Sequence, residues 1–176
     1  MQIEKTSIDG VLVTSLQKFE DERGFFARTY CQQEFSDAGV DIQLIQTNVS
    51  GNKTKGTLRG LHYQGEPHPD KKLVTCSRGS VFDVAVDLRK DSGTYLKWFG
   101  SILSAENRKG LYVPPGCAHG FITLEDDTDV NYLMGTHFVA ELSCGVRWND
   151  PAFGIEWPAE PQNINDRDAN FPNWAG

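Results

Sequence analysis

The run Val81-Phe82-Asp83-Val84-Ala85-Val86-Asp87-Leu88 is the clearest strand signal in this sequence. Since successive side chains of a strand point to opposite faces, Asp83 should share a face with Val81. Turn-forming residues bound the run on both sides, at 77–80 and at 90–93. The run therefore predicts one strand of a β-sheet that carries a carboxylate among apolar side chains.

Segments of the same kind recur along the chain, separated by turn residues. They are Val11–Leu16, Lys72–Cys76, Lys97–Leu103 and Gly120–Leu124. There is little helical periodicity between them, although short helical turns are predicted at 32–38 and 105–108. The tail after Pro158 is predicted to be coil or a short helix. Strands at this spacing predict an all-β sandwich or barrel.

The chain has 176 residues and a formal net charge of −7. This length predicts one domain spanning residues 1–176, and the acidic balance argues against a nucleic-acid surface. No run reaches membrane-span length and the N-terminus does not resemble a signal peptide, so we expect a cytoplasmic protein. The four cysteines are widely spaced, which favours free, mostly buried thiols over disulfides or a zinc site.

The segment Thr57-Leu58-Arg59-Gly60-Leu61-His62-Tyr63-Gln64 places a titratable histidine inside a predicted strand. Alternation puts His62 and Gln64 on one face with Leu58 and Gly60, whereas Arg59 takes the other face. The glycine leaves room for a close approach. A histidine in this position suits a general base, but it could equally be a core histidine with one hydrogen bond.

Three other polar residues lie in or beside predicted strands. Asp83 is costly to bury without a partner, and it could act in catalysis or brace the fold. His119 enters a strand after a proline-glycine turn, and Lys72 opens another strand; each is more often structural than functional. From the residues alone, all three assignments stay open.

A metal site is not favoured by the sequence. The chain has only four histidines, no H-x-H pair, and a His68 that lies between two prolines and is predicted to be in a surface loop. Iron or manganese sites in β-barrels need two or three histidines that converge with a carboxylate.

Several blocks of the sequence, taken together, closely resemble the dTDP-4-dehydrorhamnose 3,5-epimerase family. They follow the family's order over nearly the whole chain. The blocks are Asp21–Phe26, Leu58–Gln64, Lys72–Val74, Gly79–Arg89, Leu103–Asn107, Val113–Phe121, Trp148–Pro151, Gly154–Pro158 and Asn165–Asp168.

The resemblance implies a cupin-type jelly roll that is usually a homodimer and uses no metal and no redox cofactor. The family's substrate is a nucleotide-linked 4-keto-6-deoxy sugar, epimerised at C3 and C5. Both carbons flank the C4 ketone, so removing either proton leaves an enolate that the carbonyl can stabilise. This chemistry needs a base on one face, an acid on the other and positive charge near O4.

Carried over by position, the resemblance implies a catalytic set. His62 matches the base and Asp168 matches the carboxylate that orients it, although Asp166 lies only two residues away. Tyr132 matches the acid that returns a proton from the opposite face, and Lys72 the cation near the enolate.

The resemblance also implies a substrate-binding set. Asp83 and His119 belong to the polar cluster around the sugar, and Arg59 resembles a diphosphate ligand. The nucleotide-binding residues are Gln46 and Asn48 together with Arg23 and Phe26, the last two reaching across a dimer interface.

Three features depart from the family's pattern. His137 and Phe138 replace a pair of tyrosines, and Arg28 stands where many relatives have a carboxylate. The loop Gly65–Lys71 differs from the glutamine-containing version. These changes affect recognition of the base and placement of the sugar more than the proton-transfer residues.

The sequence therefore predicts a nucleotide-sugar epimerase acting on dTDP-4-dehydro-6-deoxyglucose in the route to dTDP-L-rhamnose. One alternative is an epimerase of a single centre, C3 or C5, or one acting on another nucleotide-linked 4-keto sugar. A different class of alternative is a non-catalytic cupin that binds sugar nucleotides, and a metal-dependent cupin oxygenase is the most distant.

Overall fold

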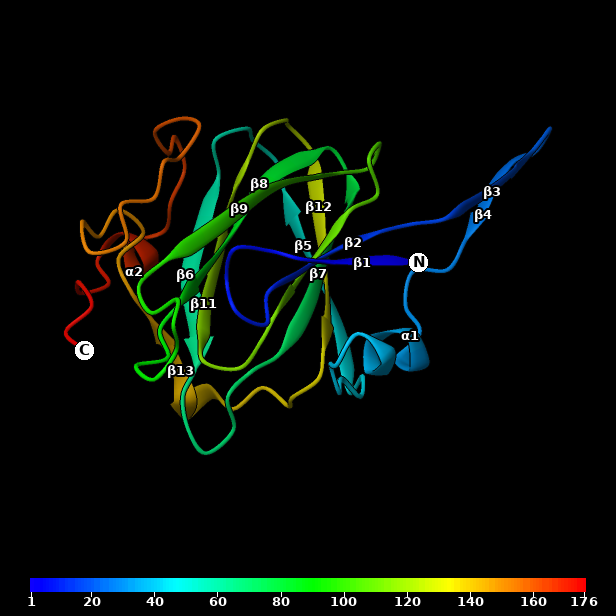
Figure 1. Ribbon diagram of the computed structural model, residues 1–176. Coiled ribbons are helices and arrows are strands. Elements are labelled where there is room, and N and C mark those ends of the chain that lie inside the picture. The colour runs from blue at the N-terminus through cyan, green and yellow to red at the C-terminus, as the bar shows by residue number, and fades with distance from the viewer.

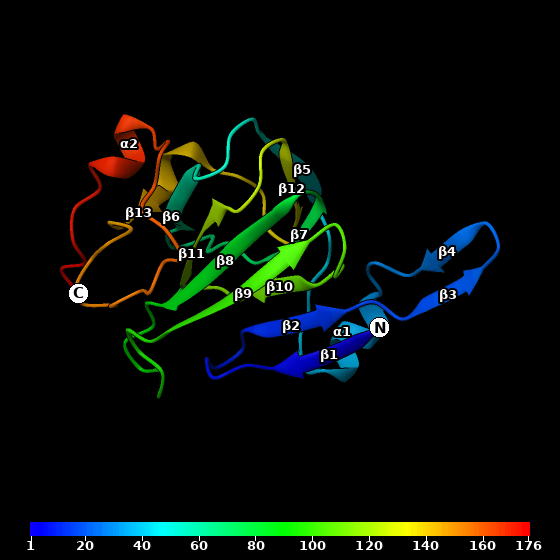
Figure 2. The same ribbon diagram turned by 90° about the horizontal axis from the view of Figure 1, so that it is seen from above.

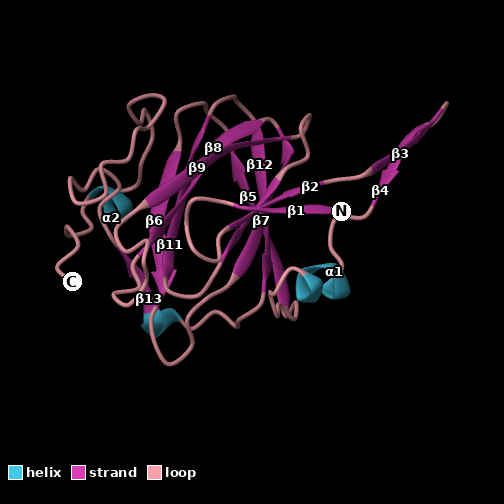
Figure 3. Ribbon diagram, viewed as in Figure 1, coloured by secondary structure: helices cyan, strands magenta, loops and turns pink.

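The computed structural model describes all residues, 1–176, and consists mainly of antiparallel strands in two large sheets (Figures 1 and 3). The first sheet has the order β1 (Gln2–Lys5), β2 (Leu12–Ser15), β10 (Gly110–Val113), β7 (Lys72–Arg78), β12 (Thr128–Met134) and β5 (Gln46–Asn52). The second has the order β13 (Ser143–Gly145), β6 (Leu58–Gln64), β11 (Cys117–Thr123), β8 (Ser80–Asp87) and β9 (Trp98–Ser104).

A two-stranded hairpin and three short helices complete the fold. The hairpin consists of β3 (Lys18–Asp21) and β4 (Gly24–Ala27), and the helices are α1 (Gln32–Asp37), α2 (Asp166–Ala169) and a 3-10 turn (Ala140–Leu142). None of the helices has the length and apolar character that crossing a membrane requires. The hairpin projects away from the two sheets (Figure 2).

The strand at 80–87 has the predicted alternation. Val81 and Ala85 are fully buried in the main core between the sheets, on the same face as Asp83. Val84 and Val86 belong to a second cluster on the other face of β8. Both faces of this central strand are therefore covered, which explains its β-branched composition.

The C-terminal segment supplies the cover for the outer face of the second sheet. It runs beside β6 and β13 in both ribbon views (Figures 1 and 2), and Trp157 and Trp174 pack on the second cluster. The Trp174 indole N–H donates to the Tyr95 hydroxyl over 2.9 Å, and the Trp174 backbone N–H donates to Asp150. These contacts hold α2 close to β6, where it bears on the site described below.

Most predicted elements are confirmed. Each of the six predicted strands is present with ends shifted by a few residues, the helix predicted at 32–38 is α1, and the tail forms α2. Ser104 accepts a hydrogen bond from the Asn107 N–H over 2.9 Å in the predicted turn. The four thiols are unpaired; Cys76 and Cys117 are buried, whereas Cys31 and Cys144 are only half-buried.

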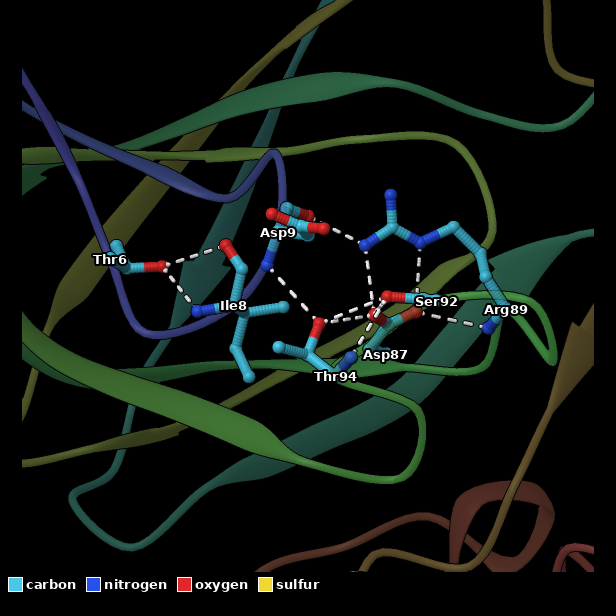
Figure 4. A network of polar contacts seen from close by, with 7 residues as sticks. All are labelled: Thr6, Ile8, Asp9, Asp87, Arg89, Ser92 and Thr94. Carbon is cyan, nitrogen blue, oxygen red and sulfur yellow. Dashed lines mark hydrogen bonds and ion pairs between the residues drawn. The ribbon is translucent and has the colours of Figure 1, made fainter.

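Asp87 closes β8 with a network of hydrogen bonds that also fixes the β1–β2 loop (Figure 4). Its carboxylate is fully buried and accepts from the Arg89 guanidinium and from the hydroxyls of Ser92 and Thr94. Arg89 and Thr94 in turn bind the backbone of Asp9. Burial raises the pKa of Asp87, but these hydrogen bonds outweigh it and bring the pKa down to about 2.

Replacing Asp87 should destabilise the fold at neutral pH. Because its folded-state pKa lies below that of an unfolded aspartate, the ionised carboxylate stabilises the fold above about pH 4. That contribution is lost as the pH falls from about 4 towards 2. We expect Asp87→Asn to lower the free energy of unfolding at pH 7 by about 2–3 kcal/mol, measured by urea titration.

The matched control is Asp91→Asn, in the same connection but exposed. It should change the free energy of unfolding by less than about 0.5 kcal/mol. An equal effect of the two substitutions would contradict the role assigned to the Asp87 network.

Candidate active site

A cavity of about 390 Å³ lies between the two sheets and is lined mostly by polar side chains. Both sheets and the loop after β12 contribute to it. The lining residues are Asn48, Ser50, Arg59, His62, Tyr63, Gln64, Asp70, Lys72, His119, Tyr132, Met134, Thr136, His137, Phe138, Ser143 and Arg167. A protein core normally excludes so many polar groups, which marks this space as a binding site.

Strand β6 contributes both His62 and Arg59 to the cavity, which strict alternation does not allow. The register with β11 shifts, so that His119 pairs with His62 but Phe121 pairs with Arg59. Since directly paired residues share a face, all four side chains lie on the inner face. The prediction that Arg59 points away from His62 is therefore wrong, because the irregularity reverses the alternation.

Gly60 lies at this irregularity, with φ of +131°. A Cβ atom there would lie 2.6 Å from the Cα of Gly120 on β11, so only glycine fits. The close approach predicted at this glycine is thus made by the neighbouring strand. The Gly60 N–H also donates to Asp168 Oδ2 over 3.0 Å, which ties the strand to α2.

His62 and Asp168 form a pair across the boundary between β6 and α2. The ring Nε2 lies 2.8 Å from Asp168 Oδ1, and the carboxylate is buried whereas the ring is partly exposed. The Asn165 side chain accepts from the Asp168 N–H over 2.7 Å and so fixes the start of the helix. A carboxylate at Nε2 holds the proton of a neutral ring there and leaves Nδ1 as the acceptor.

Burial raises the pKa of Asp168, but the hydrogen bond and charge of His62 and the Gly60 N–H outweigh it, so the net pKa is lowered. Asp168 is therefore ionised at neutral pH. Asp166, the other carboxylate of this helix, is exposed, whereas Asp168 is buried and bonded to His62.

Tyr132 and His119 approach each other from opposite sheets. Tyr132 stands on β12 and His119 on β11, with ring centroids 6.0 Å apart in an edge-on arrangement. His119 Nε2 lies 2.8 Å from the fully buried Asp83 Oδ1. Burial, followed by the negative charge of Asp83, raises the pKa of the Tyr132 phenol, which therefore keeps its proton at neutral pH.

Lys72 opens β7, lines the cavity and is almost fully buried. Its Nζ lies 2.5 Å from Asp70 Oδ2, in a loop that also lines the cavity. Burial raises the pKa of Asp70, but the charge and hydrogen bond of Lys72 outweigh it, so the pKa is lowered. The cavity therefore contains a buried ion pair.

The predicted nucleotide-binding residues are divided between two places. Arg59 and Asn48 line the cavity, and the Arg59 Nε donates to Asn52 over 2.8 Å. Gln46 lies on β5, two residues before Asn48. Its side chain contacts Asn48 and the backbone of Phe138.

Arg23 and Phe26 are not part of this cavity. They stand on the projecting hairpin β3–β4, where Phe26 is 74% exposed and the Arg23 side chain pairs only with Asp21. The structure thus brings together the other nine predicted site residues, directly or through one hydrogen-bonded neighbour.

Several residues that line the cavity were not predicted as site residues. Among them are the four polar residues Asp70, Gln64, Ser143 and Arg167. Only two of them had a detectable signal: Gln64 shares the face of His62, and Arg167 is next to Asp168. Asp70 and Ser143 lie in irregular or short segments where no periodicity applies.

The arrangement suits proton transfer. A histidine oriented by a carboxylate stands on one sheet, and a protonated phenol stands on the other. A lysine and a second histidine lie beside them, and the lysine ammonium can donate hydrogen bonds to a developing oxyanion. Arg59 supplies a guanidinium that suits phosphate oxygens.

Comparison with known proteins agrees with this chemistry. A family model described as dTDP-4-dehydrorhamnose 3,5-epimerase matches residues 5–176. The chain is 44% identical to the dTDP-4-dehydrorhamnose 3,5-epimerase of Shigella flexneri, over 97% of this chain and 94% of that protein.

The chain belongs to the dTDP-4-dehydrorhamnose 3,5-epimerase family. It is thus an isomerase, and the resemblance seen in the sequence is confirmed.

Solved structures of similar proteins have the same fold. The epimerase of Bacillus anthracis, crystallised with TDP and PPi bound, matches with a TM-score of 0.94 at 39% identity, covering 98% of this chain and 99% of that one. A 3,5-epimerase from Legionella pneumophila in complex with dTDP-4-keto-L-rhamnose matches with a TM-score of 0.91 at 36% identity, covering 98% and 92%. The predicted cupin-type jelly roll is therefore confirmed.

Some of the residues that depart from the family pattern lie in the cavity of this epimerase, and others lie outside it. His137 and Phe138 line the cavity, as does Asp70 of the divergent loop Gly65–Lys71. Arg28 instead pairs with Glu34 at the start of α1, with Nη1 and Oε1 2.7 Å apart. His68 is exposed in the loop, as predicted.

The tautomer of His62 can be measured directly. We expect nitrogen NMR of the neutral ring to find the proton on Nε2, because the Asp168 carboxylate accepts there. Asp168→Asn should disturb this tautomer, since an amide no longer requires a donor at Nε2. Asp166→Asn is the matched control and should leave the His62 signals unchanged. A neutral ring protonated on Nδ1 in the unmodified protein would contradict the geometry.

Proposed function

We propose that this protein inverts C3 and C5 of dTDP-4-dehydro-6-deoxyglucose, with His62 as base and Tyr132 as acid. The observation that carries the proposal is that these two side chains enter one cavity from different sheets. A sugar ring between them would present one face to each. Inversion requires this arrangement, since the proton leaves one face and returns to the other.

The first step removes the proton at C3 or C5. The neutral His62 takes the proton, and the electrons of the broken C–H bond form a double bond to C4 while O4 becomes negative. Asp168 favours the resulting imidazolium, since its carboxylate is held 2.8 Å from the ring. No electron leaves the sugar, so the step is not a redox change.

The negative charge on O4 needs donors in a site from which water is largely excluded. Lys72 supplies a buried ammonium that can donate to O4. A charge-assisted hydrogen bond of this kind stabilises the enolate more than the ground-state ketone. We assign Lys72 to O4 and place His119, which is held by Asp83, beside the sugar.

Tyr132 then returns a proton to the opposite face of the carbon. The raised pKa of its phenol keeps it protonated near neutral pH, as an acid must be. The enolate electrons re-form the C–H bond and the C4 ketone, and the second centre follows the same cycle. The nucleotide end is assigned to Arg59, Asn48 and Gln46, with the guanidinium on the diphosphate.

Incubation with dTDP-4-dehydro-6-deoxyglucose in deuterated water tests the function. We expect deuterium at both C3 and C5, read by proton NMR, because each carbon loses its proton to a base that exchanges with solvent. His62→Ala should reduce both exchange rates by about 10²–10⁴-fold. Tyr132→Phe should reduce deuterium uptake selectively at the centre whose reprotonation needs the acid.

His68→Ala is the control for loss of a histidine, because His68 is exposed outside the cavity. It should keep both rates within about twofold. Exchange at one carbon alone would indicate a single-centre epimerase. No exchange at either carbon, with dTDP still bound, would indicate a non-catalytic nucleotide-sugar-binding cupin.

We further propose that residues 1–176 form one cupin-like epimerase domain that works as a homodimer. The hairpin β3–β4 supports this, because it extends from the sheets and exposes the aromatic rings of Phe19, Phe25 and Phe26. Exposed aromatic side chains gathered on one projection are typical of an interface. Arg23 and Phe26 would then complete the nucleotide site of the second copy.

Mixing two inactive variants tests this arrangement. In a heterodimer, one chain carries Arg23→Ala and the other carries His62→Ala. One of its two sites would then combine an intact His62 with an intact Arg23 from the other subunit. After subunit exchange, about a quarter of the sites of the unmodified enzyme should be active. Light scattering should give the mass of two chains. No recovery in a mixture shown to contain heterodimers would refute the shared site.

We place the enzyme in the cytoplasm. Its four thiols are unpaired, and half of them are accessible enough to be oxidised in a disulfide-forming compartment.

A further inference from the structure

The buried ion pair between Lys72 and Asp70 is not explained by the reaction as written. Asp70 Oδ2 lies 2.5 Å from the Lys72 Nζ, and both side chains line the cavity and are almost completely buried. A carboxylate beside the cation offsets part of its attraction for a negative O4. The pair therefore needs a physical reason.

The reason lies in the cost of burying an ammonium. Lys72 stands on a strand with apolar neighbours, and an unpaired charge in such a place is disfavoured by several kcal/mol. The other charged or titratable groups of the cavity are His62, His119, His137, Arg59, Arg167, Tyr63 and Tyr132. None of these is an anion at neutral pH, and Asp83 and Asp168 are each bonded to a histidine. Asp70 is thus the one carboxylate bonded to Lys72.

Asp70 is itself held rigidly. Its Oδ1 accepts from the Gln64 backbone N–H over 2.9 Å. The Gln64 side chain donates to the carbonyls of His68 and His137 and accepts from the Val139 N–H. Gln64 therefore joins the loop before β7 to the loop after β12, and Asp70 has a fixed position relative to β6.

The Lys72 ammonium makes no other hydrogen bond to the protein. Two of its three N–H groups stay available for a ligand, in a direction set by the third. A flexible four-carbon side chain would otherwise have many positions for its charge.

We propose that Asp70 is a positioning residue that pairs with the buried Lys72 ammonium and aims it at the reacting carbonyl. The proposal deepens the proposed function and rests on it. Asp70 lies in the loop Gly65–Lys71, which differs from the glutamine-containing version of the family.

The effect should appear in the chemical step. The interaction of Lys72 with O4 is stronger in the enolate than in the ketone, so misplacing the ammonium lowers kcat more than substrate affinity. We expect Asp70→Asn, which retains the size and an acceptor oxygen, to reduce the exchange rates at saturating substrate by about 10–100-fold. The Kd for dTDP and the KM should stay within about twofold.

A double-mutant cycle tests whether Asp70 acts through Lys72. In the Lys72→Met background, Asp70→Asn should change the exchange rates by less than about twofold, because the group to be positioned is gone. Dependence of this kind is not expected from a residue that merely braces the loop. Asp41→Asn, an exposed carboxamide substitution outside the cavity, is the matched control and should have no effect in either background.

Folding of every variant is checked by thermal unfolding and dTDP titration. If Asp70→Asn does not fold, the cycle is repeated with Asp70→Glu, whose longer side chain displaces the ammonium and should lower kcat by at least about fivefold. Unchanged kcat, a change in KM alone, or equal effects of the Asp70 substitution with and without Lys72 would overturn the proposal. Absence of exchange in the unmodified enzyme would instead refute the proposed function.

Discussion

Three buried carboxylates, each bonded to one proton-carrying side chain, are the constraint around which the cavity is built. Asp168 holds His62, Asp83 holds His119 and Asp70 holds Lys72. Ionised groups are excluded from a core unless they are paired, so a β-sandwich that carries histidines and a lysine between its sheets must supply the partners. Each carboxylate also fixes the direction of its partner, which proton transfer requires.

The fold provides these partners from different levels of structure. Asp83 comes from a neighbouring strand, Asp70 from a loop two residues before its partner, and Asp168 from a C-terminal helix 106 residues beyond its partner. The C-terminal segment is anchored through Trp174, and the aromatic ring of Phe171 packs edge-on to His62 at 5.8 Å. The tail is thus both the cover of the second sheet and a wall of the site.

Strands with an alternating pattern were predictable, as β8 illustrates, because alternation reflects burial of one face against the core. Strands without it were missed: β3 and β4 are exposed, and β5 has only one buried residue. The hairpin that carries Arg23 and Phe26 therefore gave no strand signal, and its residues were found through resemblance. Likewise, the residues around His62 could not decide whether it is a catalyst or a core residue, because the carboxylate bonded to it lies 106 residues further along the chain.

By itself, the sequence determined the strand composition, the order of the family's blocks and the supply of titratable side chains, because these depend on local residue types. Only the tertiary structure decided that Arg59 turns inward beside His62, since a register shift against β11 reverses the alternation. It alone identified Asp70 as the partner of Lys72 and separated Asp168 from Asp166. These outcomes depend on strand register, loop conformation and burial, which result from contacts between segments far apart in the chain.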